Sequence, residues 1–281
     1  MHVFNEIAPL RAFLKAKKSD GKTIGLVPTM GALHDGHLAI VQASKVENDI
    51  TVCSIYVNPT QFNNSSDLQK YPRSIDKDTK SLEKVECDVL FYPDNEEMYE
   101  ANSQVKFDFG HLDKVMEGRF RPGHFSGVAL VVSKLFNIVE PDNAYFGQKD
   151  WQQFTIIRQF VEELKFNLRL HVIPTHREAD GLAMSSRNLR LTAEQREQAT
   201  IFFQALLFAK ENLKAGKDVD MVSRKVREII EKSGAITLEY FEVADSKNLN
   251  LLDNVKAADH PIMCIAGFVG DVRLIDNMFL D

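Results

Sequence analysis

Short apolar runs alternate along the first two thirds of the chain with longer stretches in which apolar residues recur every three or four positions. The short runs are typical of buried strands and fall at residues 24–27, 50–57, 88–92, 143–146 and 169–173. The longer stretches have the period of amphipathic helices and fall at residues 8–18, 36–46, 74–85, 128–139 and 154–164. This order predicts an α/β fold with a Rossmann-like, mostly parallel sheet of five strands, whose first strand ends at Pro28.

Two segments in the middle of the chain depart from this order. Periodicity fades over residues 94–104, and Val105, Phe107 and Phe109 then alternate with polar neighbours, which predicts a short strand at an edge or in an insertion. Residues 117–127, EGRFRPGHFSG, have the composition of a flexible basic loop rather than of a core element. Such a loop either contacts a polyphosphate or faces water.

A smaller unit follows Arg190. Thr192 and Gln195 have the spacing of a capping box, which predicts the start of one long helix toward Gly216. A second helix is predicted at residues 222–232, and alternating strands follow at residues 237–244, 262–268 and 272–275. We therefore expect a Rossmann-like domain at residues 1–176 and a smaller α+β domain at residues 177–281, which lies as a lid against the ligand crevice of the first.

Composition and charge exclude several classes of protein. Of the 281 residues, 44% are apolar and 26% are charged, as in an ordinary globular protein with an ample core. The formal net charge of −6 argues against a nucleic-acid-binding surface. Cys53, Cys87 and Cys264 are far apart in the sequence and are expected to be small buried residues. No apolar run has the length of a membrane span or the form of a signal peptide, so we expect a cytoplasmic protein without membrane or nucleic-acid partners.

The first candidate site is the loop between the strand at 24–27 and the helix that begins near Gly36. His34 and His37 stand three residues apart at this helix N-terminus, where free N–H groups and the positive end of the dipole favour anions, phosphate above all. A histidine there can also simply cap or pack, and an HxxH pair can ligate a metal, although no neighbouring Cys or carboxylate completes a zinc set.

Further candidates follow other strands. Asn58 and Gln61 are neutral amides that either suit hydroxyl and carboxyl groups or form a turn; Asn58, which precedes a proline, favours the turn, whereas both interpretations stay open for Gln61. Lys149 shares a helix face with Gln153, but Asp150 and Gln153 also fit a capping box beside a solvated lysine. The last candidate group consists of Ser185, Ser186 and Arg187. These side chains either donate hydrogen bonds to phosphate oxygens or form a polar turn. Because these loops leave the carboxyl ends of strands, they meet at one rim, which fits an enzyme that handles a polyphosphate and a small polar acid.

The string PTMGALHDGH resembles the signature of the pantothenate synthetase family, in which HxGH is the form of the HIGH motif shared with nucleotidyltransferases and class I aminoacyl-tRNA synthetases. The strings NPTQF, RPGHFSGV, GQKDWQQ and GLAMSSRN resemble further family motifs in the same order. The last is a counterpart of the synthetases' KMSKS loop. The chain departs from the family at Gln148, where Glu is usual, and at His176, where an aliphatic residue is more common.

The resemblance implies a cytoplasmic, homodimeric ligase that joins (R)-pantoate and β-alanine with ATP and Mg²⁺, through pantoyl adenylate. It implies His37 as proton donor, with His34, Lys149 and Arg187 as further catalytic residues. It implies pantoate binding by Gln61, Gln153 and Arg121, and β-alanine binding by Gln61. It assigns no metal ligand. The implied ATP-binding residues are Met30, Gly31, Ala32, Leu33, His34, Asp35, Gly36, His37, Gly147, Gln148, Lys149, Asp150, His176, Met184, Ser185, Ser186 and Arg187.

Two other functions stay open. One is a nucleotidyltransferase of the same superfamily that attaches AMP to a phosphorylated substrate, and the other is a nucleotide-binding regulatory module without catalysis. The amides of Gln61 and Gln153 argue against the first, because a phosphate-bearing substrate would require more cationic groups.

Overall fold

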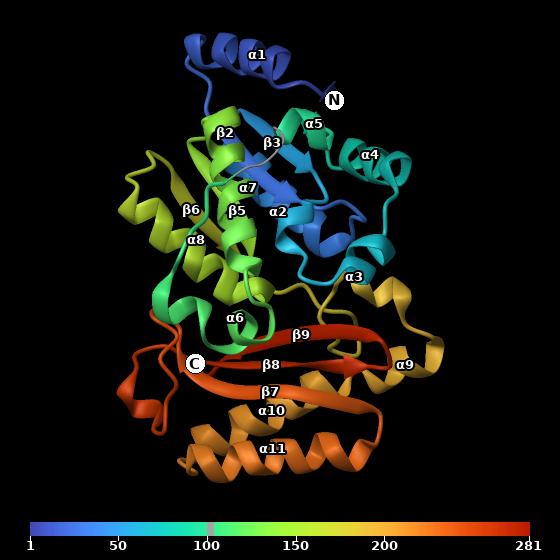
Figure 1. The fold of residues 1–281 in the computed structure, drawn as a ribbon, viewed down its shortest axis with the longest axis vertical. Helices are drawn as coiled ribbons and strands as arrows, with labels where there is room; N and C mark the ends of the chain where they lie inside the picture. Colours follow the sequence, from blue (N-terminus) through green and yellow to red (C-terminus); the bar gives the residue numbers. More distant parts are fainter. Residues whose placement is uncertain (100–103) are drawn as a thin grey trace.

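A computed structural model describes residues 1–99 and 104–281, which form two sheets (Figure 1). All neighbouring strands of the first sheet are parallel, so the Rossmann-like α/β prediction is confirmed. In spatial order its strands are β1 (His2–Phe4), β4 (Val89–Phe91), β3 (Ile50–Ile55), β2 (Ile24–Thr29), β5 (Asn143–Gly147) and β6 (Arg169–Ile173). The predicted number of five strands is wrong, because β1 is a largely exposed edge strand of three residues that gives no apolar run.

Helices cover both faces of this sheet. One face packs on α1 (Ile7–Ser19), α7 (His124–Val139) and α8 (Trp151–Glu163), and the other on α2 (Asp35–Glu47) and α4 (Ile75–Lys84). Along β2, Leu26 points into the first core and Val27 into the second, as expected for a parallel strand buried on both faces. β2 ends at Thr29, one residue beyond the predicted end at Pro28. The strand tolerates Pro28, which has no N–H, because β5 pairs only with Gly25 and Leu26 and this position lies beyond that ladder.

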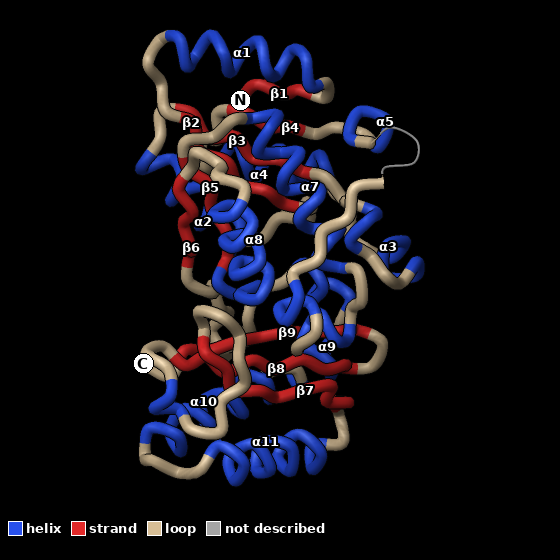
Figure 2. Tube along the Cα trace, turned by 60° about the vertical axis from the view of Figure 1, so that its left-hand side comes forward, coloured by secondary structure: helices blue, strands red, loops and turns tan. Residues whose placement is uncertain are grey.

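The second sheet is antiparallel and consists of β7 (Ile236–Asp245), β8 (Pro261–Val269) and β9 (Val272–Phe279). α10 (Ile201–Lys214) and α11 (Val219–Ser233) cover the side that faces away from the first sheet (Figure 2). The opposite side contributes Tyr240, Ile262 and Cys264 to the same core as α7 and α8. The predicted C-terminal α+β unit is confirmed, whereas the boundary at residue 176 stays a prediction.

Several local predictions are wrong. Residues 105–109 form no strand, because Phe107 and Phe109 stack with their ring centroids 6.0 Å apart and pack against the core without pairing to a sheet. Of the preceding segment 94–104, in which periodicity fades, residues 100–103 lie outside the described residues. The capping box at Thr192 is present, but it opens the short α9 (Ala193–Gln198) and not one long helix.

The predicted flexible basic loop at residues 117–127 is also wrong. It contains α6 (Met116–Phe120) and the first turn of α7, and Glu117 and His124 are buried. The other short elements are η1 (Pro59–Gln61), α3 (Ser65–Lys70), α5 (Asn95–Met98), η2 (Gly110–Asp113), η3 (Gln148–Asp150), η4 (Ser186–Arg190) and η5 (Val255–Ala257). Among the described residues, no helix combines the length and apolar character needed to cross a membrane.

Candidate active site

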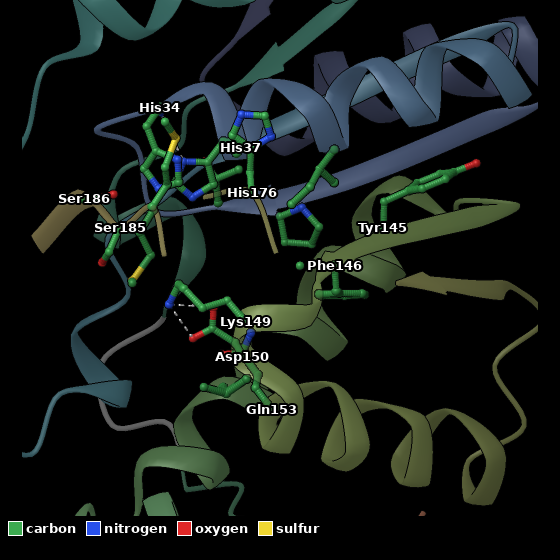
Figure 3. Close-up of a pocket in the computed structure, with 18 of the residues that line it drawn as sticks. His34, His37, Tyr145, Phe146, Lys149, Asp150, Gln153, His176, Ser185 and Ser186 are labelled. Carbon is green, nitrogen blue, oxygen red and sulfur yellow. Dashed lines mark hydrogen bonds and ion pairs between the residues drawn. The ribbon is translucent and has the colours of Figure 1, made fainter. Parts of the chain in front are cut away.

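A cavity of about 190 Å³ opens where β2, β5 and β6 end (Figure 3). Its apolar wall includes Val128, Val132 and Phe146. Figure 3 shows the imidazoles on one side of the open space, with Lys149, Asp150 and Gln153 on the other. The predicted site residues that line it are Met30, His34, Gly36, His37, Gln61, Gly147, Lys149, Asp150, Gln153, His176, Met184, Ser185, Ser186 and Arg187.

The two histidines lie at the start of α2, as predicted. His34 is the N-cap residue, and its ring stacks on that of His37 with a centroid distance of 3.9 Å. The His34 backbone N–H donates to Nδ1 of His37 at 3.4 Å. This packing favours glycine at position 36, because a Cβ there would lie 3.0 Å from His34 Nδ1 and 3.3 Å from the Cβ of His176, and these neighbours would have to shift slightly. The rings therefore form a fixed pair at the helix N-terminus.

Both imidazoles are neutral near pH 7. Burial, reinforced by the Lys149 charge, lowers the pKa of His34 to about 4. Burial and the neighbouring His34 lower the pKa of His37 well below its usual range. Neutral imidazoles can donate hydrogen bonds to phosphate oxygens without placing a cation at the positive end of the helix dipole.

The loop that carries Met30 and His34 is held from behind by Asp78 of α4. This buried carboxylate accepts the backbone N–H groups of Ala32 and Leu33, both at 2.8 Å. On its other side, the Ser186 hydroxyl donates to the carbonyl of Ala32 at 3.0 Å. Gly31, Ala32, Leu33 and Asp35, for which the resemblance predicts ATP binding, are not among the cavity-lining residues. Asp78 has no local sequence signal, because it binds a loop more than 40 positions away.

Lys149 and Asp150 lie in η3 at the opposite side of the cavity. The predicted capping box is wrong: Asp150 is the N-cap residue of α8, but its carboxylate makes no cap hydrogen bond and pairs instead with Lys149, 3.3 Å from Nζ. Gln148 turns away and its amide donates to Asn277 of β9 at 3.3 Å. Asn277 in turn donates to the carbonyls of Gln148 and Lys149 at 2.9 and 2.7 Å. The second sheet thus fixes η3 through a residue that the sequence patterns do not single out.

The Ser-Ser-Arg turn is tied to α3, which the sequence does not predict. Asp67 accepts from Arg187 at 2.8 Å and from Arg190 at 2.9 Å. Burial opposes ionisation of Asp67, but its two arginine partners outweigh this effect and lower its pKa. The Arg187 guanidinium also lies over the Tyr71 ring, with 5.9 Å between its carbon and the ring centroid, and Tyr71 lines the cavity. These contacts place Arg187 at the cavity wall with its charge paired.

Gln61 extends into the cavity from η1. Its side chain accepts from Asn58 Nδ2 at 3.1 Å, and its own Nε2 lies 3.0 Å from the sulfur of Met30. The turn interpretation of Asn58 is confirmed, since its side chain accepts from the Thr60 N–H. Arg121, for which the resemblance predicts pantoate binding, does not line this cavity. Its guanidinium lies behind Gln61, 3.5 Å from the Gln61 carbonyl oxygen.

Comparison with known proteins gives one consistent result. The family model described as pantoate-beta-alanine ligase matches residues 2–279. The chain is 48% identical to the pantothenate synthetase of Bacteroides fragilis, over 99% of this chain and 98% of the relative. It is 44% identical to the pantothenate synthetase of Aquifex aeolicus, over 98% of this chain and 97% of the relative.

Solved structures agree with this result. The pantothenate synthetase of Thermus thermophilus superposes with a TM-score of 0.93 at 38% identity and covers 100% of this chain and 99% of its own. The pantoate-beta-alanine ligase of Francisella tularensis, solved in complex with "Beta-gamma ATP" and β-alanine, gives 0.83 at 34% identity, over 100% of this chain and 98% of its own.

Proposed function

The chain belongs to the pantoate-beta-alanine ligase family, and from that premise we propose how its cavity performs the ATP-dependent ligation of pantoate to β-alanine. The carboxylate of pantoate attacks the α-phosphorus of ATP, which forms pantoyl adenylate and releases pyrophosphate. The neutral amine of β-alanine then attacks the acyl carbon, the acyl C–O bond to AMP breaks, and AMP leaves with its electrons while the new amide nitrogen loses one proton. Neither step requires a covalent bond to the enzyme.

The observation that carries this proposal is that groups suited to phosphate and groups suited to a hydroxy acid line the same cavity. On the phosphate side, His34, His37 and Lys149 donate to the phosphate oxygens of ATP, together with Ser185, Ser186 and Arg187. Donors that are already in place stabilise the charge that develops on the leaving pyrophosphate. The nucleotide of the Francisella tularensis relative supports an ATP site of this kind.

Among the other residues predicted to bind ATP, Met30, Gly36, Gly147, His176 and Met184 line the wall beside the nucleotide. We assign an indirect role to those outside the lining. Gly31, Ala32, Leu33 and Asp35 shape the loop and helix start that present the histidines, and Gln148 fixes η3 against β9.

On the acid side, Gln61 and Gln153 bind the hydroxyl and carboxylate groups of pantoate and hold the carboxylate in line with the α-phosphorus. Gln61 also lies beside the incoming β-alanine. The β-alanine bound by the Francisella tularensis relative supports a site for this substrate next to the nucleotide. Arg121 acts on pantoate through Gln61.

Mg²⁺ is proposed to accompany ATP. Within residues 1–99 and 104–281, no three His, Cys, Asp or Glu side chains form a metal-binding group. The Asp150 carboxylate in the cavity lining fits Mg²⁺, which keeps several waters and binds through substrate phosphates and one or two carboxylates. Asp150, at the cavity wall, would hold it, and the bound ion would neutralise phosphate charge. A homodimer and a cytoplasmic location stay predictions.

The test separates the two sides of the cavity by calorimetric binding of ATP and of pantoate. Lys149→Ala is expected to weaken ATP about tenfold, and Gln153→Ala is expected to weaken pantoate by a similar factor while ATP affinity changes less than twofold. The matched controls are Lys80→Ala, which removes an exposed lysine of α4, and Gln159→Ala, on α8 outside the cavity. Equal effects of Gln153→Ala on both ligands would contradict the assignment.

A further inference from the structure

His124, which is buried, and Arg121, which is partly buried, lie directly behind Gln61 and outside the lining of this cavity. His124 is the first residue of α7 and is 5% exposed. Its Nδ1 lies 2.8 Å from the backbone carbonyl oxygen of Gln61, and its Nε2 lies 3.1 Å from Nη1 of Arg121. The ring therefore joins the guanidinium to the backbone of a residue whose side chain faces the substrates.

The partners of His124 define its tautomer. A guanidinium has only donors, so Nε2 must accept from Arg121, and Nδ1 must carry the proton that is donated to the Gln61 carbonyl. Burial, with the adjacent Arg121 charge, lowers the pKa of His124 to about 3, so the ring stays neutral at neutral pH. One tautomer thus satisfies both contacts.

The backbone of η1 is pressed against the first turn of α7. A Cβ at Gly127 would lie 2.3 Å from the Thr60 carbonyl oxygen and 2.7 Å from the Gln61 nitrogen, so only glycine permits this approach. Asn58 adds a hydrogen bond from Nδ2 to the carbonyl of Gly127 at 3.1 Å. The position of Gln61 is therefore set by α7, and His124 supplies the hydrogen bond to its carbonyl.

Arg121 is held in turn by Glu117, whose carboxylate lies 3.6 Å from Nη1. The same carboxylate accepts two hydrogen bonds from Arg273 of β9, at 2.6 and 2.8 Å, and one from the Tyr240 hydroxyl at 2.8 Å. The Arg121 guanidinium is thus fixed between a buried anion and the His124 ring.

We propose that His124 is a positioning residue for pantoate: it fixes the Gln61 backbone, with Arg121 selecting its tautomer, and so sets the direction of the Gln61 amide without touching the substrate. This proposal rests on the proposed binding of pantoate by Gln61. It gives Arg121 an effect on pantoate that is transmitted through His124 and Gln61.

Three substitutions of His124 separate its two nitrogens. His124→Asn keeps an N–H donor at the distance of Nδ1 from Cβ. His124→Gln places its amide near the position of Nε2 and loses the Nδ1 donor. His124→Phe keeps a ring of similar shape but has neither nitrogen. We expect His124→Gln and His124→Phe to raise the KM for pantoate about tenfold, while the dissociation constant of ATP stays within twofold. His124→Asn is expected to stay within about threefold of the wild type.

The matched control is His111→Asn, because the exposed His111 also lies near a backbone carbonyl, that of Leu249 at 3.3 Å, but outside the cavity lining. It should leave the KM for pantoate unchanged. If His124→Phe does not fold, the Asn and Gln variants carry the same comparison, with thermal unfolding measured for each.

Gln61→Ala distinguishes the positioning role from the proposed function. A raised KM for pantoate in Gln61→Ala, with an unchanged KM in His124→Gln and His124→Phe, would overturn the positioning role and leave the proposed function intact. An unchanged KM in Gln61→Ala itself would refute the assignment of Gln61 to pantoate, and the positioning role with it. Equal losses of ATP and pantoate affinity in all three His124 variants would show a structural role only and would also overturn the proposal.

Discussion

Asp78→Asn tests whether a carboxylate behind the cavity holds the loop that carries His34. Asp78 is 2% exposed, and its two oxygens each accept a backbone N–H, from Ala32 and Leu33, at 2.8 Å. Gly31 and Ala32 have φ angles of 77° and 49°, in the left-handed region, so this loop is held in a conformation that Ala32 disfavours. Asparagine offers one oxygen and turns an NH₂ group toward the second N–H.

The magnitude follows from these two hydrogen bonds. A hydrogen bond to a charged group contributes about 1.5–3 kcal/mol to stability, and a neutral acceptor contributes roughly half as much. The second backbone N–H becomes unsatisfied, which costs about 1–3 kcal/mol. Together these effects lower the free energy of unfolding by about 3 kcal/mol, or the Tm by about 6–12 °C at roughly 2–4 °C per kcal/mol.

The assay is differential scanning calorimetry with Asp76→Asn as the matched control. Asp76 lies in the first turn of the same helix and is exposed, so its substitution removes the same charge and should shift the Tm by less than about 2 °C. Hydrogen exchange at the amides of residues 32 and 33 should accelerate only in Asp78→Asn. If Asp78→Asn melts within about 2 °C of Asp76→Asn and exchange is unchanged, the carboxylate does not hold the loop.

Three further predictions concern catalysis and pH. His37→Ala should slow pantoate-dependent pyrophosphate release about 100-fold or more, as for a positioned donor, and wild-type rates would remove His37 from the mechanism. Because the pKa of His34 falls from 6.5 to about 4 on folding, the stability that its neutral ring contributes is complete above pH 6.5 and is lost as the pH falls toward 4; NMR titration should find no ionisation of this imidazole above pH 6. Burial opposes ionisation of Glu117, but Arg273 and Arg121 outweigh this effect and lower its pKa from 4.5 to about 2. The stability that the Glu117 carboxylate contributes is therefore complete above pH 4.5 and is lost as the pH falls toward 2. In Glu117→Gln, the free energy of unfolding measured in urea should depend less on pH between 4.5 and 2.

Elements with strong local patterns could be predicted from the sequence. The strands β3, β5 and β6 coincide with predicted apolar runs. The start of α2 beside the two histidines could be predicted because the glycines that precede it and the helical period that follows lie within a few residues of one another. The loops that follow β2, β3 and β5 supply residues to one cavity, as expected at the carboxyl ends of parallel strands.

Features that depend on distant partners could not be predicted. Residues 117–127 have the composition of a solvated basic loop, yet Glu117 is buried because Arg273, more than 150 positions later, neutralises it. Likewise Asp67 and Asn277 contact the site only through the fold, and the apparent capping box at Asp150 is absent because Lys149 takes its carboxylate. Local spacing identifies candidate groups but does not show which partner each one meets.

The proposed mechanism requires ATP and pantoate to meet in one cavity before β-alanine acts. Rapid-quench measurement of pyrophosphate release from ATP, with pantoate present and β-alanine absent, tests this most directly. We predict about one pyrophosphate per active site, no release without pantoate, and AMP release only when β-alanine is added. Release without pantoate, as for a different nucleotidyltransferase, or no release until β-alanine is present, would contradict the adenylate mechanism.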